Sequence, residues 1–496
     1  MTHAATEKTS FSIAEIRSII IGLMLIILLA ALDQTIVSVS LPRMAQDLGG
    51  ASLLAWVVSG YLVAATVSTP IYGKLGDLYG RRSLLIAAIA IFLAASVLCA
   101  LATSMPLLIV ARVLQGIGGG GLLATSQAII GDVVPLRERG RYQGYISVVY
   151  AVASVGGPVL GGYLTHYLSW RWVFWINLPL GAVAYLASYK ALRGLAVPGI
   201  RRRIDYAGAL LLTAGLSALL IAVTRVGQGV ALLAPQTIAL LALAVLVLAA
   251  FVWHEARTEE PVMPLHLFRI PTVAIGCAIL FICFFQVVSI SVLLPFGMQT
   301  LEGIGADAAA LRLIAYSLGM PFGAFIGGRI MMHSGRYRPI QIVGTGALTL
   351  GVFLLAWIGP HASLACTAAM IIAGVAAGST MPTSLVAVQN AVPQANIGVA
   401  TAIVALFRSM GGAVGVAVLS AILFALMQPA AGAPGLGIEG MTAGGAAPNP
   451  EAEHAFTVVF LVAGAVALMS HLLSWMLPES HLESRPAAAA PVDAEG

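Results

Sequence analysis

Long apolar runs, separated by short polar breaks, follow one another along almost the whole chain. Fourteen of them have about 18–25 residues, enough for a helix to cross a bilayer core roughly 30 Å thick. They lack the alternation of apolar and polar positions that a barrel strand needs, so helices are the expected spanning form. The predicted spans are residues 18–40, 53–73, 83–103, 106–130, 142–164, 172–190, 206–223, 232–253, 272–294, 309–332, 339–358, 363–386, 397–424 and 455–477.

Composition supports a polytopic membrane protein. Hydrophobic residues make up 59% of the 496 positions and charged residues only 9%, against about 25% charged residues in soluble domains. A water-soluble globular fold is therefore excluded. The first apolar run has no small-residue cleavage site after it, so it is expected to stay as a helix. All four cysteines fall in apolar spans, which favours packing over disulfides or metal ligands.

The positions of lysine and arginine predict the orientation. With the N-terminus inside, 19 of the 25 basic residues fall in inner segments and four in outer segments, while Arg112 and Arg408 lie inside spans. This bias satisfies the positive-inside rule and predicts that both termini lie in the cytoplasm. The net charge of +5 is thus explained by topology and gives no reason to expect a nucleic-acid partner.

One acidic residue lies deep in the first span. Asp33 comes 16 residues after Arg17, about 24 Å into the core if the run is helical. A charge at that depth costs at least about 2.5 kcal/mol on insertion scales, so a use for it is expected. The carboxylate could hold a proton, a cation or a salt-bridge partner, and it is the only acidic group well inside any predicted span.

Arg112, in the fourth span, offers this carboxylate a partner. Counted from the outer face, Arg112 lies about 9 Å deep and Asp33 about 6 Å deep, so we expect the two charges to pair. The pair could be purely structural. It could instead be a proton-coupling site, because motion that separates the arginine from the carboxylate changes the affinity of the carboxylate for a proton.

The segment between the second and third spans reads GKLGDLYGRR. Glycines allow close backbone approach, the aspartate can accept hydrogen bonds at a helix end, and the basic residues hold the segment inside. An ordinary charged turn would explain these features equally well. The spacing, however, resembles the signature loop of the major facilitator superfamily, Gly-x-x-x-Asp-x-x-Gly-Arg-Arg/Lys. This resemblance assigns a conformational role to Gly73, Gly76, Asp77, Gly80, Arg81 and Arg82.

Other segments carry the same resemblance. RVLQGIGGG, which opens with Arg112, is similar to the fourth-helix motif of the superfamily. GGPVLGG resembles the fifth-helix motif of antiporters, which assigns a conformational role to Gly157, Pro158, Gly161 and Gly162. LDQTIVSVSLP, WVVSGYL and WRWVFWINLPLG resemble segments of the fourteen-helix drug:proton antiporters of the EmrB/QacA type. The matches cover nearly the whole chain in order.

The resemblance implies an all-α polytopic membrane protein with the major facilitator fold. Residues 18–190 and 272–477 are expected to form two six-helix bundles, joined by residues 191–271 with two inserted transmembrane helices. Residues 1–17 and 478–496 are then cytoplasmic ends. The second half weakly repeats the first: Gly328 to Tyr337 matches the GKLGDLYGRR segment, and Gly411, Gly412 and Gly415 echo the fifth-helix glycines. Met332 stands where the first half has Asp77, which leaves a matching gating role open.

A cavity for amphipathic compounds needs apolar and aromatic surface with a few polar groups. The candidates are Trp56, Tyr61, Gln115, Tyr150, Phe285, Gln286, Tyr316, Phe407 and Arg408, and each could equally face lipid or pack. Arg408 lies in a half of the chain without any acidic residue inside its spans, where it could face the cavity or cap helix carbonyls. Some relatives that export divalent cations use a second carboxylate there, so monovalent cationic or neutral substrates are favoured.

The expected function is multidrug efflux, in which amphipathic drugs and toxic compounds, cationic or neutral, leave by alternating access in exchange for protons. The proton gradient supplies the energy, and no cofactor or metal is expected. A metabolite permease of the same superfamily is the alternative. A membrane enzyme or sensor is disfavoured, because the chain has no HExxH or GxxxxGK[ST] stretch. A monomer without a periplasmic adaptor is expected, since the segment around 430–453 is short.

Overall fold

The computed structural model describes residues 13–50, 53–192, 205–227, 230, 233–361, 363–393, 396–427 and 450–479. Helices dominate these ranges. In the first half they are α1 (Ile13–Leu48), α2 (Leu54–Tyr79), α3 (Arg81–Ala100), α4 (Met105–Val133), α5 (Leu136–Tyr167), the short α6 (Trp172–Trp175) and α7 (Asn177–Ala191). After α8 (Tyr206–Gly227), α9 (Pro235–Glu255) and the 3-10 helix η3 (Leu265–Arg269), the second half contains α10 (Pro271–Glu302), α11 (Ala306–Ser334), α12 (Arg338–Ile358), α13 (Leu364–Ala391), α14 (Ile397–Met427) and α16 (Pro450–Met476).

The predicted spans agree with these helices. Thirteen helices in the described ranges are long and apolar enough to cross a membrane. α2 is not among the thirteen, but it is a continuous helix of 26 residues and completes the set of fourteen. The sixth predicted span is built from α6 and α7, which are separated by Ile176. Several helices extend beyond the predicted ends, because a helix continues past the apolar stretch until a turn residue or cap ends it. The expected segments at residues 1–12, 428–449 and 480–496 lie outside the described residues.

Local sequence signals explain many of the helix ends. The Ser104 hydroxyl accepts a hydrogen bond from the amide of Leu107 at the start of α4, and Ser363 caps α13 through the amide of Cys366. Gly80 separates α2 from α3 with φ at 87°, a left-handed value that a side chain would strain. The GKLGDLYGRR segment is therefore the end of one helix, a glycine turn and the start of the next.

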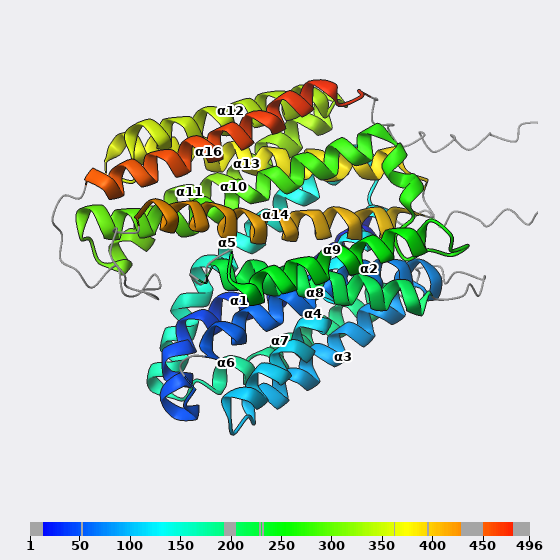
Figure 1. Ribbon diagram of the computed structural model, residues 1–496. Coiled ribbons are helices and arrows are strands. Elements are labelled where there is room, and N and C mark those ends of the chain that lie inside the picture. Colours follow the sequence, from blue (N-terminus) through cyan, green and yellow to red (C-terminus); the bar gives the residue numbers. More distant parts are fainter. Residues whose placement is uncertain are drawn as a thin grey trace, which may run out of the picture.

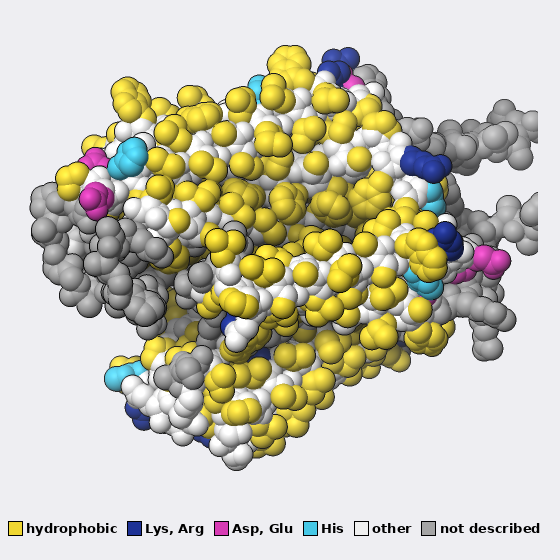
Figure 2. All heavy atoms as spheres, in the orientation of Figure 1, with side chains coloured by type: hydrophobic (Ala, Val, Ile, Leu, Met, Phe, Trp, Pro, Cys, Tyr) yellow, Lys and Arg dark blue, Asp and Glu magenta, His cyan; other side chains and the backbone are white. Residues whose placement is uncertain are grey.

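The helices form two bundles with the same internal arrangement (Figure 1). In the first, α4 packs against α2 and α3, and α5 packs against α1. In the second, α13 packs against α11 and α12, and α14 packs against α10. Between the bundles, α5 contacts α11 and α2 contacts α14, while α8 and α9 pack on each other and α8 also touches α2 and α14. Hydrophobic side chains cover the visible face, and charged groups gather near its two ends, as expected for a protein surrounded by lipid (Figure 2).

Glycines on α4 and α13 show the repeat at the level of residues. A Cβ on Gly116 would lie 2.4 Å from the carbonyl oxygen of Tyr61, and one on Gly374 would lie 2.4 Å from that of Tyr316. One turn later, a Cβ on Gly120 would meet the carbonyl oxygen of Ala65. In the same way, a Cβ on Gly378 would meet the carbonyl oxygen of Met320. These contacts place the helix backbones against each other. They also make Tyr61 and Tyr316 structural counterparts.

Candidate functional site

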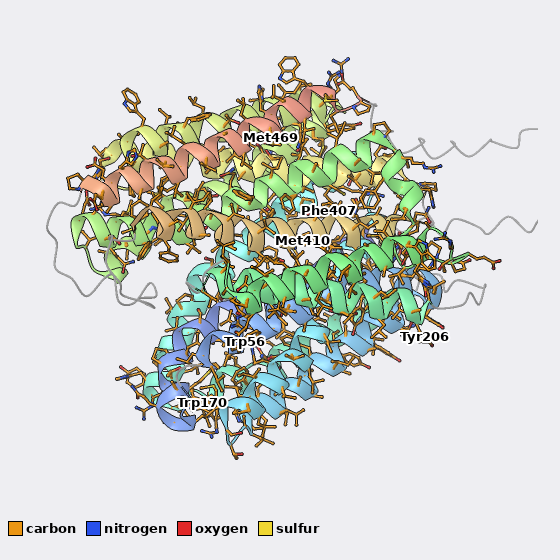
Figure 3. All side chains as sticks on the ribbon, in the orientation of Figure 1. Trp56, Trp170, Tyr206, Phe407, Met410 and Met469 are labelled. Atoms are coloured by element: carbon orange, nitrogen blue, oxygen red, sulfur yellow. The ribbon has the colours of Figure 1, made fainter. Side chains whose placement is uncertain are left out.

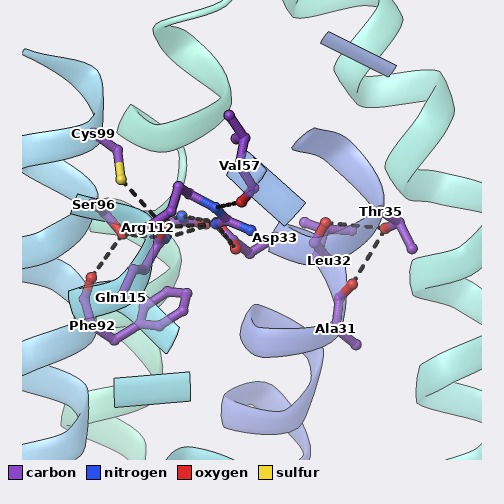
Figure 4. A network of polar contacts seen from close by, with 11 residues as sticks. Ala31, Leu32, Asp33, Thr35, Val57, Phe92, Ser96, Cys99, Arg112 and Gln115 are labelled. Carbon is purple, nitrogen blue, oxygen red and sulfur yellow. Dashed lines mark hydrogen bonds and ion pairs between the residues drawn. The ribbon is translucent and has the colours of Figure 1, made fainter. Parts of the chain in front are cut away.

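Asp33 lies at the centre of a polar network in the interior of the first bundle (Figure 4). Its Oδ2 accepts a hydrogen bond from Nη1 of Arg112 at 2.6 Å, so the pairing predicted from depth is confirmed. Its Oδ1 accepts from Nε2 of Gln115 and from Nδ2 of Asn177, each at 2.8 Å. Both carboxylate oxygens are therefore satisfied, as a buried charge requires.

Arg112 is held by several groups besides the carboxylate. Its Nε donates to the backbone carbonyl of Val57 on α2 at 3.1 Å, and its Nη1 also donates to Oε1 of Gln115 at 2.7 Å. The guanidinium lies 4.3 Å from the ring centroid of Tyr61, close enough for a cation–π contact. Through Val57 the arginine is bonded to the same helix that ends in the GKLGDLYGRR segment.

The network is closed off from its surroundings. Asp33, Gln115, Asn177 and Ser96 are 0% exposed, and Arg112 is 1% exposed. The residues come from α1, α3, α4 and α7, with the Val57 carbonyl from α2, so one bundle supplies the whole network. The polar groups are enclosed in protein and do not face the second bundle.

Sequence reasoning missed Asn177. Its amide donates to Asp33 and, at 3.3 Å, to the hydroxyl of Ser96. Asn177 is the first residue of α7, directly after the break between α6 and α7, and this break brings its side chain to α1. The sequence does hold a signal, because a lone asparagine stands in the apolar stretch WVFWINLPLG. That signal is weak, since an uncharged polar residue in a span carries less penalty than a charge.

Replacing Asn177 with leucine should lower the thermal stability of the protein. Asp33 would lose one of its donors, and a charged group that loses a buried hydrogen bond costs about 1.5–3 kcal/mol. Melting of the detergent-solubilised protein measures the effect. The matched control is Ser188→Ala on the same helix, because the buried Ser188 hydroxyl has no hydrogen-bond partner among the described residues. Equal melting temperatures for both variants would contradict the role given to Asn177.

The fifth-helix glycines bring α5 against α1 beside the network. A Cβ on Gly157 would meet the Thr35 hydroxyl at 1.9 Å, and one on Gly161 would meet the Ile36 carbonyl at 2.7 Å. The Thr35 hydroxyl donates to the carbonyl of Ala153 at 2.8 Å. Gly162 has open space around it and Pro158 is exposed, so these two residues of the motif do not join the contact.

The GKLGDLYGRR segment joins the two bundles at one end of the molecule, called here the loop end. Asp77 Oδ2 accepts the backbone amide of Val399, at the start of α14, at 3.1 Å, and Asp77 Oδ1 pairs with Arg81 Nη2 at 2.9 Å. Arg81 also pairs with Asp132 on α4. Gly73 lies so close to α14 that a Cβ would be 2.5 Å from the Cβ of Ala402. A carboxylate at a helix N-terminus is favourable, because it accepts free amide groups and complements the helix dipole.

The remaining residues of the segment have separate contacts. Arg82 lies 4.8 Å from the ring centroid of Tyr189, within the first bundle. Lys74 Nζ pairs at 3.1 Å with Glu260, which follows the two inserted helices. Gly76 has ordinary space around it, 3.8 Å from the side chain of Arg81.

A second contact closes the loop end between α5 and α11. A Cβ on Gly140 would lie 3.0 Å from the Cα of Gly328, and Arg139 donates to Oε1 of Gln389 on α13 at 3.2 Å. Gly328 opens the segment that matches GKLGDLYGRR, so both halves use this segment to approach the other bundle. Only the first half does so with a carboxylate, since Met332 takes the place of Asp77.

Comparison with known proteins gives the family. The model of the Major Facilitator Superfamily matches residues 23–416. The chain belongs to the major facilitator superfamily. It is 34% identical over 406 residues to the multidrug transporter protein MdtP of Bacillus subtilis, covering 82% of this chain and 75% of that protein. It is 30% identical over 444 residues to multidrug resistance protein 3 of the same organism, covering 89% and 86%. The structure of the proton:xylose symporter XylE matches with a TM-score of 0.60 and 19% identity, over 95% of this chain and 98% of that one.

As a member of the superfamily, the protein is a membrane transporter for small molecules, and the cavity candidates can be placed in its fold. Five of the nine are buried inside a bundle in this structure, which corrects the expectation that they line a cavity: Tyr61, Gln115, Phe285, Gln286 and Tyr316. Gln286, for example, donates to the carbonyl of Ala463 on α16 at 2.7 Å. Large side chains on the helices of a superfamily bundle pack inward as readily as toward the cavity, so residue type alone does not separate the two. Trp56, Tyr150, Phe407 and Arg408 are half-buried and stay candidates.

Proposed function

We propose that this superfamily member exports amphipathic drugs and toxic compounds in exchange for protons, and that it is a fourteen-helix antiporter of the EmrB/QacA type. The observation that carries the proposal is the enclosed ion pair of Asp33 and Arg112, at 2.6 Å. Ionisable groups inside a membrane usually serve ion or substrate movement. The multidrug transporters among the relatives, MdtP and multidrug resistance protein 3, support export of drugs rather than uptake of a metabolite.

The proposed location is a bacterial cytoplasmic membrane, with the loop end and both termini in the cytoplasm. The excess of lysine and arginine in the segments on that side supports this orientation. The contacts of Asp77 with α14 and of Gly140 with Gly328 would then close the cytoplasmic side, which supports the proposal that the structure represents an outward-facing state. From this state, we propose, the enclosed network opens toward the outer side and Asp33 takes a proton that arrives from outside.

The network supplies the proposed coupling. Protonation removes the negative charge of Asp33 and weakens its bond to Arg112, so the arginine would be left with the Val57 carbonyl, Gln115 and the Tyr61 ring. The guanidinium would then pull more strongly on α2 through its hydrogen bond to the Val57 carbonyl. The same helix carries Asp77 at its other end, where its carboxylate holds the start of α14. A shift of α2 that detaches Asp77 would open the cytoplasmic side and let the proton leave.

Everted membrane vesicles from cells that produce the protein test the exchange. A growth-inhibition panel first identifies a compound against which the protein protects. Adding this compound to vesicles with an acidic interior should raise the internal pH, because each transport cycle releases protons from the lumen. Control vesicles without the protein should keep their pH. An unchanged pH with every protective compound would overturn proton exchange.

A further inference from the structure

Arg408 is a second intramembrane cation, and the network around Asp33 does not use it. It lies 11 residues after the start of α14, about 17 Å along the helix. Among the described residues of α10 to α16, it is the only Asp, Glu, Lys or Arg more than six positions from both ends of its helix. A charge at this depth is expected to have a functional partner.

The contacts of α14 define the direction in which Arg408 points. One face of α14 lies on α10, where Gly411 and Gly415 approach the carbonyls of Phe281 and Phe285. Another face lies on α2, where Ala402 meets Gly73. At 100° per residue, Arg408 falls between these two faces, on the same edge as Gly412. It therefore faces α10 and is turned from there toward α2 of the first bundle. Figure 3 labels its neighbours Phe407 and Met410 in the middle of α14.

In the part of the chain that the structure describes, the Arg408 side chain caps no carbonyl. Its guanidinium lies 5.2 Å from the ring centroid of Phe284 on α10, and within the described residues it forms no ion pair or hydrogen bond. Arg112 is likewise placed over an aromatic ring, that of Tyr61, but Asp33 neutralises it. Arg408 thus also lies over an aromatic ring, but it has no carboxylate paired with it among the described residues. It is also half-buried rather than enclosed, so part of its side chain is open to its surroundings.

Among the residues that the structure describes, no acidic group neutralises Arg408. Asp33 is on the first bundle, is 0% exposed and already accepts hydrogen bonds on both oxygens. The spans of the second half contribute no carboxylate, as the sequence indicates. A planar guanidinium with several free N–H groups binds carboxylates and sulfonates in a bidentate manner, most strongly where water is scarce.

We propose that Arg408 binds the anionic group of the exported compounds, and that the protein therefore accepts amphipathic organic acids whose aromatic or aliphatic part lies against Phe284. This inference rests on the proposed export function and names its substrate class. It differs from the expectation of monovalent cationic or neutral compounds, which rested on the absence of a second carboxylate from the later spans. In this structure the accessible intramembrane charge is positive.

Binding of a matched pair of probes to the purified protein tests the inference. The probes are a naphthyl-substituted alkanoic acid and its primary carboxamide, which differ in charge but hardly in shape, and tryptophan fluorescence follows their binding. The wild type should bind the acid about ten- to hundredfold more tightly than the amide. Arg408→Gln should bind both equally, at the affinity of the amide. Arg408→Lys should keep part of the preference, because it retains the charge but loses the planar donor pair.

Arg312→Gln is the matched control, since Arg312 is an exposed arginine near the start of α11 and its removal should leave the preference unchanged. Equal binding of acid and amide by the wild type would overturn the inference, and this comparison needs no variant. An undiminished preference in Arg408→Gln would also overturn it. Because binding is measured without a proton gradient, failure of proton exchange in vesicles and failure of the acid preference are separate results.

Discussion

Replacing Asp33 with asparagine is expected to abolish uphill, proton-driven export while downhill movement of substrate continues. The variant cannot exchange a proton at this position, and its neutral side chain resembles the protonated state of the carrier. Proteoliposomes with a defined pH gradient measure the first property, and the same vesicles with a substrate gradient alone measure the second. Unimpaired uphill export by Asp33→Asn would refute the assignment of Asp33 as the proton site.

Asp33→Asn is also expected to lower the stability of the folded protein, so the transport experiment needs a control for folding. It leaves Arg112 buried without its counter-ion, and removing one partner of a buried ion pair costs about 3–5 kcal/mol. Retained downhill transport shows that the variant is folded. Asp47→Asn is the matched control, because Asp47 lies near the end of the same helix, is partly exposed and accepts a hydrogen bond from the indole of Trp170 that an asparagine oxygen can also accept. It should leave both activities unchanged.

Replacing Asp77 with alanine is expected to open the loop end. The variant loses the ion pair with Arg81 and the bond to the amide of Val399, which exists only while the bundles are closed there. A charge-assisted hydrogen bond contributes about 1.5–3 kcal/mol. A change of about 1.4 kcal/mol shifts a two-state population tenfold, so the open state should become at least about tenfold more populated.

Spin labels on cysteines at Ser83 and Ser334 measure this shift. Both side chains are exposed at the loop end, Ser83 on α3 in the first bundle and Ser334 at the end of α11 in the second. Electron–electron distance measurements should report a longer distance in Asp77→Ala than in the parent protein. Glu138→Ala removes another, exposed carboxylate at the loop end and should leave the distribution as it is. An unchanged distribution in Asp77→Ala would show that this carboxylate does not hold the bundles together.

The sequence predicted the helices and the ion pair well, because both depend on properties that are nearly one-dimensional. Apolar length defines a span, and residue counting from a helix end gives depth, so Asp33 and Arg112 could be matched from the sequence alone. The residues that complete the network were harder. Gln115 was expected in the cavity, and Asn177 reaches Asp33 only because the chain breaks at Ile176 between α6 and α7.

Which way a side chain faces was the main property that the sequence left undetermined. Every face of a membrane helix is apolar, so hydrophobic periodicity is weak and does not separate lipid, bundle interior and cavity. Tyr61 and Tyr316 were expected in the cavity and are instead buried at equivalent positions of the two bundles. Arg408 could be recognised as unusual, but its direction follows only from the glycine contacts of α14 with α10 and α2.

The confinement of the Asp33 network to one bundle has a consequence for how such a transporter can change during evolution. The proposed proton chemistry depends on residues of the first half, whereas Arg408, the proposed binding group for the substrate, belongs to the second. Substitutions around α10 and α14 can then alter which compounds are exported without changing the proposed coupling to protons. New resistance could arise by variation of one half of the gene while the other half stays constant.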